Sequence, residues 1–290
     1  MKKILITGGK GYFASRFSLH YKDKYEILAI DKDQLDIRDE NKTIELMKDF
    51  KPNYVIHAAA IAVTDFCNEH PDIAHDINVK GALNVAKGCE MTNSKLIFLS
   101  SEQVFNGNTE SGPYTEDHTA LPDTVYGQNK LEVEGKLKEI FNDYWIVRFT
   151  WLFGLPDKGL PVNANIMWNT VQTILTGKKE KVPANEYRGM AYGYDVIEKF
   201  DKIFNLPFGT YHVGSENDMS RYEVVKFIFK EMGLENRLDE FIIKDTEKYK
   251  VNPRDVRLST AKIRNLGVNF LNTEEAIKKC IKDYSLNFSK

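Results

Sequence analysis

The chain has 290 residues, of which 42% are hydrophobic and 28% are charged, and its formal net charge at pH 7 is −2. This length can bury one large core or two unequal ones, and the composition is typical of a folded globular protein. The near-neutral charge, without a run of like charges, argues against nucleic acid as a partner, and no stretch is apolar enough to cross a membrane.

Short apolar runs alternate with longer amphipathic stretches in the first half of the chain. The apolar runs are continuous, as expected of strands in a parallel sheet that is buried on both faces. They predict strands at 3–7, 25–30, 54–57, 96–100 and 145–149. The intervening stretches predict helices at about 11–22, 41–50, 71–91 and 124–141. This alternation favours an α/β fold with a Rossmann-like, doubly wound parallel sheet.

The pattern changes after Gly154, where a segment rich in glycine and proline predicts a loop. The remainder predicts helices at about 164–176, 192–205, 221–232 and 273–284, and short strands near 210–213 and 240–243. We therefore expect a dinucleotide-binding Rossmann-like domain at 1–154 and a small C-terminal α/β substrate-binding lobe at 155–290, with the chain crossing between the two.

A glycine-rich loop follows the first predicted strand and opens the first predicted helix. Its spacing, Gly8-x-x-Gly11-x-x-Ala14, is a variant of the dinucleotide fingerprint, in which backbone amides approach a pyrophosphate at a helix N-terminus. Tyr12 and Phe13, which lie inside this loop, are included in the predicted cofactor site.

The residue that follows the second predicted strand indicates which dinucleotide is bound. Asp31 stands where a carboxylate accepts hydrogen bonds from the adenosine ribose, and its charge repels a 2′-phosphate. The site therefore favours NAD(H). NADP(H) is the alternative, because the neighbouring Lys32 softens that repulsion.

Tyr126 and Lys130 lie four residues apart on a predicted helix, so their side chains share one face. An ammonium about 5 Å from a phenol stabilises the phenolate by roughly 3 kcal/mol at an effective dielectric near 20, or about two pK units. We expect this interaction to lower the pKa of Tyr126 toward the range in which it exchanges protons at neutral pH. A Tyr and a Lys at this spacing also occur by chance in amphipathic helices, so the surrounding motifs are needed to indicate whether the pair is catalytic.

Further segments accompany these two motifs in a fixed order: 35–39 (LDIRD), 58–60 (AAA), 99–107 (LSSEQVFNG) and 148–154 (RFTWLFG). The ordered set resembles the extended short-chain dehydrogenase/reductases and, within them, the dTDP-4-dehydrorhamnose reductase group. The resemblance covers nearly the whole chain and is strongest in the first 155 residues. It implies NAD(P)H-dependent reduction of a nucleotide-linked 4-keto-6-deoxy sugar, with dTDP-4-dehydro-L-rhamnose to dTDP-L-rhamnose as the leading reaction.

The resemblance also implies roles for individual residues. Tyr126 would protonate the carbonyl oxygen, Lys130 would lower the pKa of the phenol and hold the nicotinamide ribose, and Ser101 would hydrogen-bond the carbonyl. The other cofactor contacts that it implies are Asp36 and Ile37 against adenine, and Ala58, Ala59 and Ala60 beneath the central part of the cofactor. The implied substrate contacts are Trp151, which would stack on the sugar, Glu102, which would bind its hydroxyls, Asp65 and Phe105.

The second half departs from the family pattern. Glu102 replaces the usual Asp, and the loop at 185–191 is largely rewritten. Some relatives hold a metal partly through a Glu in the first helix, where this chain has Arg16, so no metal is predicted.

Two other functions remain open. An epimerase of the same fold would consume no NADH. A non-catalytic NAD(P)-binding regulatory subunit would not need to retain Ser101, Tyr126 and Lys130 together. A homodimer is left open as well.

The three cysteines, Cys67, Cys89 and Cys280, lie far apart and match no metal or disulfide spacing. We expect them to be buried, reduced thiols. The apolar run after Met1 ends at Thr7, which is too short for a signal peptide, so a cytoplasmic protein is expected.

Overall fold

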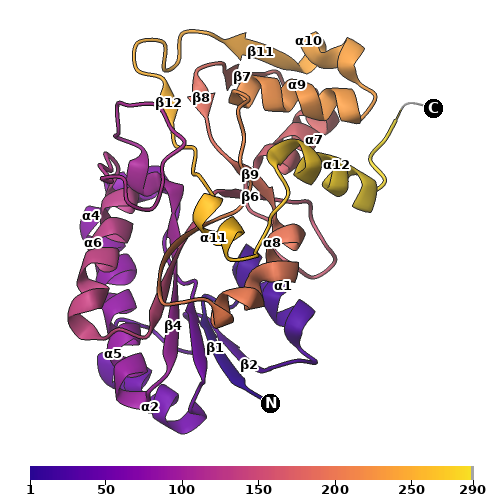
Figure 1. Cartoon of the computed structure of the whole chain (residues 1–290). Coiled ribbons are helices and arrows are strands. Elements are labelled where there is room, and N and C mark those ends of the chain that lie inside the picture. The colour runs from indigo at the N-terminus through magenta and orange to yellow at the C-terminus, as the bar shows by residue number, and fades with distance from the viewer. Residues whose placement is uncertain (289–290) are drawn as a thin grey trace.

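The computed structural model describes residues 1–288 and contains a central sheet of six strands flanked by helices, with a smaller lobe at one end (Figure 1). The order across the sheet is β10 (Gly209–Val213), β5 (Tyr144–Phe149), β4 (Lys95–Ser101), β3 (Tyr54–His57), β1 (Lys3–Thr7) and β2 (Glu26–Ile30). All five neighbouring pairs are parallel. The predicted Rossmann-like α/β fold is therefore confirmed.

Both faces of the sheet are covered, which explains why the strand sequences are continuously apolar. Successive side chains of a strand point to opposite faces, so Leu5 joins one core while Ile4 and Ile6 join the other. The helices over the first face are α2 (Glu40–Phe50), α5 (Ala82–Thr92) and α6 (Val125–Ile140) (Figure 1). Those over the second are α1 (Tyr12–Tyr21), α8 (Gly193–Phe200) and α11 (Ala261–Asn265) (Figure 1).

The strand order changes direction beside β1, which lies between β2 and β3. Open α/β sheets bind their ligands at such a switch, outside the carboxyl ends of the strands. The last residues of β1 and β3 are linked there, because Thr7 Oγ1 lies 2.8 Å from His57 Nδ1. This edge of the sheet is where a functional site is expected.

The segment predicted as one helix at 71–91 is a continuous helical run with an irregular centre. It consists of α4 (Pro71–His75), a π-helical segment (Asp76–Gly81) and α5, and it follows a further helix, α3 (Thr64–Glu69), that was not predicted. The π-helical segment carries Asn78, whose side-chain oxygen accepts from the Ile61 amide at 2.7 Å and whose amide donates to the Ile61 carbonyl at 3.0 Å. Asn78 thereby fixes the loop after β3.

The smaller lobe has a hydrophobic core of its own. Its helices are α7 (Ile166–Thr176), α9 (Arg221–Glu231), α10 (Leu238–Phe241) and α12 (Thr273–Asp283). Its strands form three parallel pairs: β6 (Trp151–Phe153) with β9 (Met190–Tyr192), β7 (Glu180–Pro183) with β11 (Ile242–Asp245), and β8 (Glu186–Tyr187) with β12 (Arg254–Asp255). Short 3₁₀ segments lie in both parts of the described chain: Glu102–Phe105 follows β4, Asp201–Asn205 follows α8, and Glu235–Arg237 precedes α10.

The second half of the chain does not stay in the lobe. It returns to the central sheet, where α8 and α11 cover one face and β10 pairs with β5 at the edge. Within residues 1–288, no helix is both long and apolar enough to span a membrane. The three cysteines are free and buried, as predicted.

A buried cation ties α1 to the loop that follows β6. The Arg16 side chain is fully buried, and its Nη2 lies 2.7 Å from Asp157 Oδ2 while its Nη1 donates to the Pro161 carbonyl at 2.7 Å. Asp157 also accepts hydrogen bonds from the hydroxyls of Tyr194 and Tyr284. This cluster fastens the lobe to the glycine-rich end of the sheet.

Candidate active site

Tyr126 lies in the first turn of α6, where the helix comes very close to the 3₁₀ segment after β4. Thr124 caps the helix, and its hydroxyl accepts from the Gly127 amide at 3.3 Å. A Cβ atom on Gly127 would lie 2.4 Å from the Gln103 carbonyl oxygen, which is closer than real contacts allow. The glycine after Tyr126 therefore permits the close approach that brings the phenol to the end of β4.

The three predicted catalytic residues come together at the carboxyl end of β4. Ser101 is the last residue of that strand, and its side chain is hydrogen-bonded to the half-buried phenol of Tyr126. Lys130 is buried one helical turn further on, with its Nζ 5.7 Å from the centroid of the Tyr126 ring. The same ammonium donates to the Leu99 carbonyl at 2.7 Å.

The electrostatics of this set differ from the sequence prediction. Burial raises the pKa of Tyr126 well above its ordinary value, and the hydrogen bond with Ser101 opposes this rise only in part. Burial also lowers the pKa of Lys130 to about 8, against the attraction of Glu134. The prediction that Lys130 lowers the pKa of Tyr126 is wrong for this structure, because burial of the phenol raises that pKa and the ammonium is directed to the Leu99 carbonyl.

The glycine-rich loop forms a cradle of small residues beside the end of β3. Gly8 has a φ of 71°, and a Cβ atom there would lie 2.8 Å from the Ala59 Cα. Gly11 is the N-cap of α1 and provides no side-chain cap to that helix N-terminus. With the half-buried Ala58 and Ala60 alongside, these residues fit a pyrophosphate that approaches the backbone closely.

Asp31 follows β2 at the same edge of the sheet. Its Oδ2 accepts from the Lys10 amide at 3.0 Å and its Oδ1 from the Lys32 amide at 2.8 Å. The Lys10 ammonium is paired with Asp33, and Lys32 is exposed. The structure thus brings Asp31, Gly8 and Gly11 together.

Four predicted cofactor residues have their side chains engaged elsewhere. The exposed Asp36 pairs with Arg38, and Ile37 is buried beside Gly81. Two expectations need correction: the Tyr12 hydroxyl is buried and donates to the Phe153 carbonyl at 3.0 Å, and Phe13 packs in the core against other aromatic rings. These two residues can offer a cofactor only their backbone amides.

The predicted substrate residues do not form one group. Glu102 is buried beside Ser101 and pairs with Arg188, whose guanidinium lies 4.3 Å from the centroid of the Trp151 ring. Arg188 thus covers a ring that was expected to stack on a sugar. Asp65 is exposed in the first turn of α3.

Phe105 needs correction as a substrate residue. It is fully buried and stacks on Tyr114, with a centroid distance of 4.6 Å, and the Arg148 guanidinium lies 5.1 Å from its ring centroid. In this position a substrate cannot contact the Phe105 ring.

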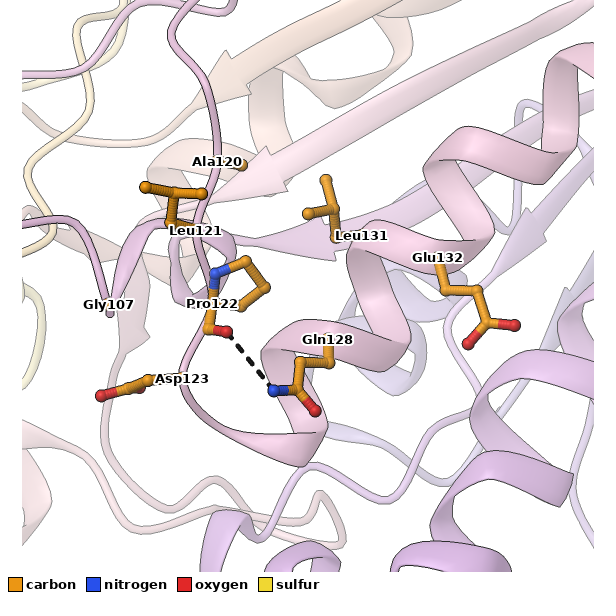
Figure 2. Close-up of a pocket in the computed structure, with 8 residues that line it drawn as sticks. All are labelled: Gly107, Ala120, Leu121, Pro122, Asp123, Gln128, Leu131 and Glu132. Carbon is orange, nitrogen blue, oxygen red and sulfur yellow. Dashed lines mark hydrogen bonds between the residues drawn. The ribbon is translucent and has the colours of Figure 1, made fainter.

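A surface groove of about 630 Å³ lies on the other side of α6 (Figure 2). Its lining residues are Gly107, Ala120, Leu121, Pro122, Asp123, Gln128, Leu131 and Glu132. None of these described residues belongs to the predicted site. The helix therefore presents its reactive face to β4 and a different face to this groove.

A family model described as the RmlD substrate binding domain matches residues 1–286. The chain belongs to this family. It is 30% identical to dTDP-4-dehydrorhamnose reductase of Aggregatibacter actinomycetemcomitans, over 80% of this chain and 79% of that protein. It is also 26% identical to methionine adenosyltransferase 2 subunit beta of Bos taurus, over 92% of this chain and 83% of that protein.

The fold of this RmlD-family chain matches solved structures over its whole length. The structure of dTDP-4-dehydrorhamnose reductase from Bacillus anthracis str. Ames in complex with NADP superposes with a TM-score of 0.84. The two chains are 26% identical, and the match covers 98% of this chain and 99% of the other. The family thus includes proteins named as reductases and proteins named as subunits of another enzyme.

Sequence reasoning missed a cluster of charges behind Trp151 in this RmlD-family chain. The buried Glu186 carboxylate lies between three guanidinium groups, at 3.6 Å from Arg188, 3.2 Å from Arg221 and 3.5 Å from Arg254. Arg188 is two residues from Glu186, but Arg221 and Arg254 come from distant segments, so no spacing in the sequence indicates the whole cluster. Within residues 1–288, no three His, Cys, Asp or Glu side chains are grouped so that they could hold a metal.

Proposed function

We propose that this chain reduces the 4-keto group of a nucleotide-linked 6-deoxy sugar with NAD(P)H. The observation that carries the proposal is the meeting of Ser101, Tyr126 and Lys130 at the carboxyl end of β4, on the same sheet edge as the glycine-rich loop. A protein that only binds a dinucleotide has no need of a proton donor at that place. The family membership supports the same reaction class.

The residues have the chemistry that ketone reduction needs. Negative charge develops on the carbonyl oxygen, so a proton donor and a fixed hydrogen bond stabilise the transition state. The raised pKa of Tyr126 keeps its phenol protonated at neutral pH, ready to donate, and Ser101 supplies the fixed hydrogen bond. A bound dihydronicotinamide supplies the hydride.

We propose that Gly8, Gly11, the backbone of 12–13, and Ala58–Ala60 hold the cofactor, with Lys130 at the nicotinamide ribose. In this proposal NAD(H) is the preferred cofactor, because the Asp31 carboxylate would accept hydrogen bonds from the ribose hydroxyls and would repel a 2′-phosphate. NADP(H) is the alternative. The exposed Lys32, which follows Asp31 in the chain, would attract that phosphate.

The leading substrate is dTDP-4-dehydro-L-rhamnose, on the strength of the relatives that are named as its reductases. Glu102 would accept hydrogen bonds from the sugar hydroxyls, and Trp151 would contact the sugar if Arg188 moves from its ring. The charged cluster around Glu186 makes this wall of the site polar.

The test is a panel of nucleotide 4-ketosugars, including dTDP-4-dehydro-L-rhamnose, with oxidation of NADH and of NADPH followed for each. We expect stoichiometric cofactor oxidation with at least one of them. Tyr126→Phe should lower kcat roughly 10²- to 10⁴-fold while NADH still binds. Tyr144→Phe, at the opposite end of β5, is the matched control and should leave kcat unchanged.

Two other outcomes would replace this proposal. Interconversion of nucleotide sugars without net NADH loss would indicate an epimerase. NAD(P) binding without turnover of any sugar would indicate a non-catalytic subunit; the bovine relative is named as a subunit of another enzyme.

A further inference from the structure

Helix α6 is fastened to β4 by three side chains that succeed one another at intervals of four residues. Tyr126 is hydrogen-bonded to Ser101, and Lys130 donates to the Leu99 carbonyl at 2.7 Å. The third contact is made by Glu134, whose Oε1 accepts from the Ser100 hydroxyl at 2.6 Å. Residues one turn apart lie on the same helix face, so Glu134 lies on the face of α6 that carries Tyr126 and Lys130.

Glu134 is held by a second and stronger partner from β5. The Arg148 Nε lies 3.0 Å from Oε1, and its Nη2 lies 2.6 Å from Oε2, so the pair is bidentate. Both side chains are more than nine-tenths buried. On its far side the guanidinium lies 3.4 Å from His212 Nε2, which belongs to β10. These hydrogen bonds fix the carboxylate between α6, β4 and β5.

The surroundings of Lys130 give Glu134 a particular importance. The titratable groups that act on its ammonium are Tyr126 and Glu134 on the same helix, His57 at the end of β3, and Cys67 on α3. The ring of Phe98 lies 4.7 Å from Nζ and offers no charge. Burial holds His57 neutral, because it lowers the pKa of that side chain to about 3. Of these described neighbours, Glu134 is the one carboxylate.

We propose that Glu134 is a positioning residue of this active site, whose buried carboxylate keeps Lys130 protonated and holds α6 in the place where Tyr126 meets Ser101. The proposal rests on the proposed function for the role of Lys130, but its electrostatic part concerns the protein alone. Arg148 binds the same carboxylate from β5, and its positive charge opposes the effect of Glu134 on Lys130.

The consequence for Lys130 can be measured directly. Two unit charges about 6 Å apart, the usual spacing of positions one turn apart on a helix, change a pKa by about two units at an effective dielectric near 20. We therefore expect Glu134→Gln to lower the pKa of Lys130 by at least about one unit. The alkaline limb of activity should move to lower pH by the same amount, because a neutral lysine no longer supports the reaction.

The first experiment is a ¹³C NMR titration of lysine-labelled protein, in which the Lys130 resonance is assigned by its loss in Lys130→Arg. Glu132→Gln is the matched control, because Glu132 is on the same helix but half-exposed and paired with His75 and Lys136. The expected result is a lowered Lys130 titration in Glu134→Gln and an unchanged one in Glu132→Gln. Equal titrations in wild type and Glu134→Gln, or equal shifts in both variants, would overturn the proposal.

Glu134→Gln leaves Arg148 buried without its partner, which can prevent folding. The double variant Glu134→Gln/Arg148→Met removes both charges, so it should also lower the pKa of Lys130, but by less than Glu134→Gln because the opposing charge of Arg148 is removed as well. A folded double variant with a wild-type Lys130 titration counts against the proposal as well.

The second experiment is the pH profile of kcat on any ketosugar that the panel identifies. A shifted NMR titration without turnover of any ketosugar would defeat the proposed function and leave the electrostatic role of Glu134 standing. If a ketosugar is turned over but Glu134→Gln shifts neither the Lys130 titration nor the alkaline limb of kcat, the proposed function stands and the electrostatic role of Glu134 is refuted.

Discussion

Replacement of Gly127 by alanine tests whether the approach of α6 to the end of β4 creates the reactive set. The added Cβ would lie 2.4 Å from the Gln103 carbonyl oxygen and 2.9 Å from the Pro122 Cβ, whereas ordinary contact begins at 3.4 Å. The first turn of the helix must therefore move by about 1 Å, and Tyr126 moves with it. A displacement of about 1 Å at a reacting group costs roughly 10²-fold in kcat, and overpacking costs about 1–3 kcal/mol of stability.

The assay compares kcat from NADH oxidation with the free energy of unfolding from urea denaturation. Gly135→Ala is the control on the same helix, because an added Cβ there meets nothing within 4 Å. It should leave kcat unchanged and stabilise the protein by about 0.5–1 kcal/mol. Wild-type kcat in folded Gly127→Ala, or an equal loss of kcat in Gly135→Ala, would refute the reasoning.

Three other substitutions test separate parts of the structure. Asp31→Ala should narrow the preference for NADH over NADPH by about tenfold in kcat/KM, and an unmoved ratio would mean that another residue contacts the ribose. Arg16→Met should lower the free energy of unfolding by about 3 kcal/mol in urea, because Asp157 loses its buried partner; wild-type stability would show that the pair contributes nothing. Phe105→Leu should lower stability by about 1–2 kcal/mol and leave KM for the ketosugar unchanged, whereas a raised KM at unchanged stability would return Phe105 to the substrate site.

The sequence predicts the sheet and its edge well because the signals there are local. Strands buried on both faces leave continuous apolar runs, and β1 and β3 have the predicted bounds. The loop at Gly8 is identified by its spacing, since a positive φ and a close neighbour both require glycine. The helical interval between Tyr126 and Lys130 predicts a shared face, and α6 places both on it.

The parts that were missed depend on contacts between distant segments. Of the cations around Glu186, Arg188 follows β8, Arg221 begins α9 and Arg254 lies in β12. The pairing of β10 with β5 likewise joins segments far apart in the sequence. The sequence around Phe105 does not indicate whether the ring contacts a sugar or stacks on Tyr114, because tertiary packing decides between the two. The direction of the Lys130 ammonium is likewise set by the Leu99 carbonyl rather than by helical spacing.

Two features limit how fragments and chimeras of this architecture can be designed. The second half of the chain returns to the sheet, and Arg16 is paired with Asp157 across the two halves. A fragment that ends near Gly154 would lack its outer strand β10 and would leave the Arg16 guanidinium without its carboxylate. We therefore expect that such a fragment does not fold on its own, and that moving the lobe into another protein as one piece would disrupt both parts of the chain. Altered specificity is better engineered by grafting single loops, such as 185–191, onto an intact chain.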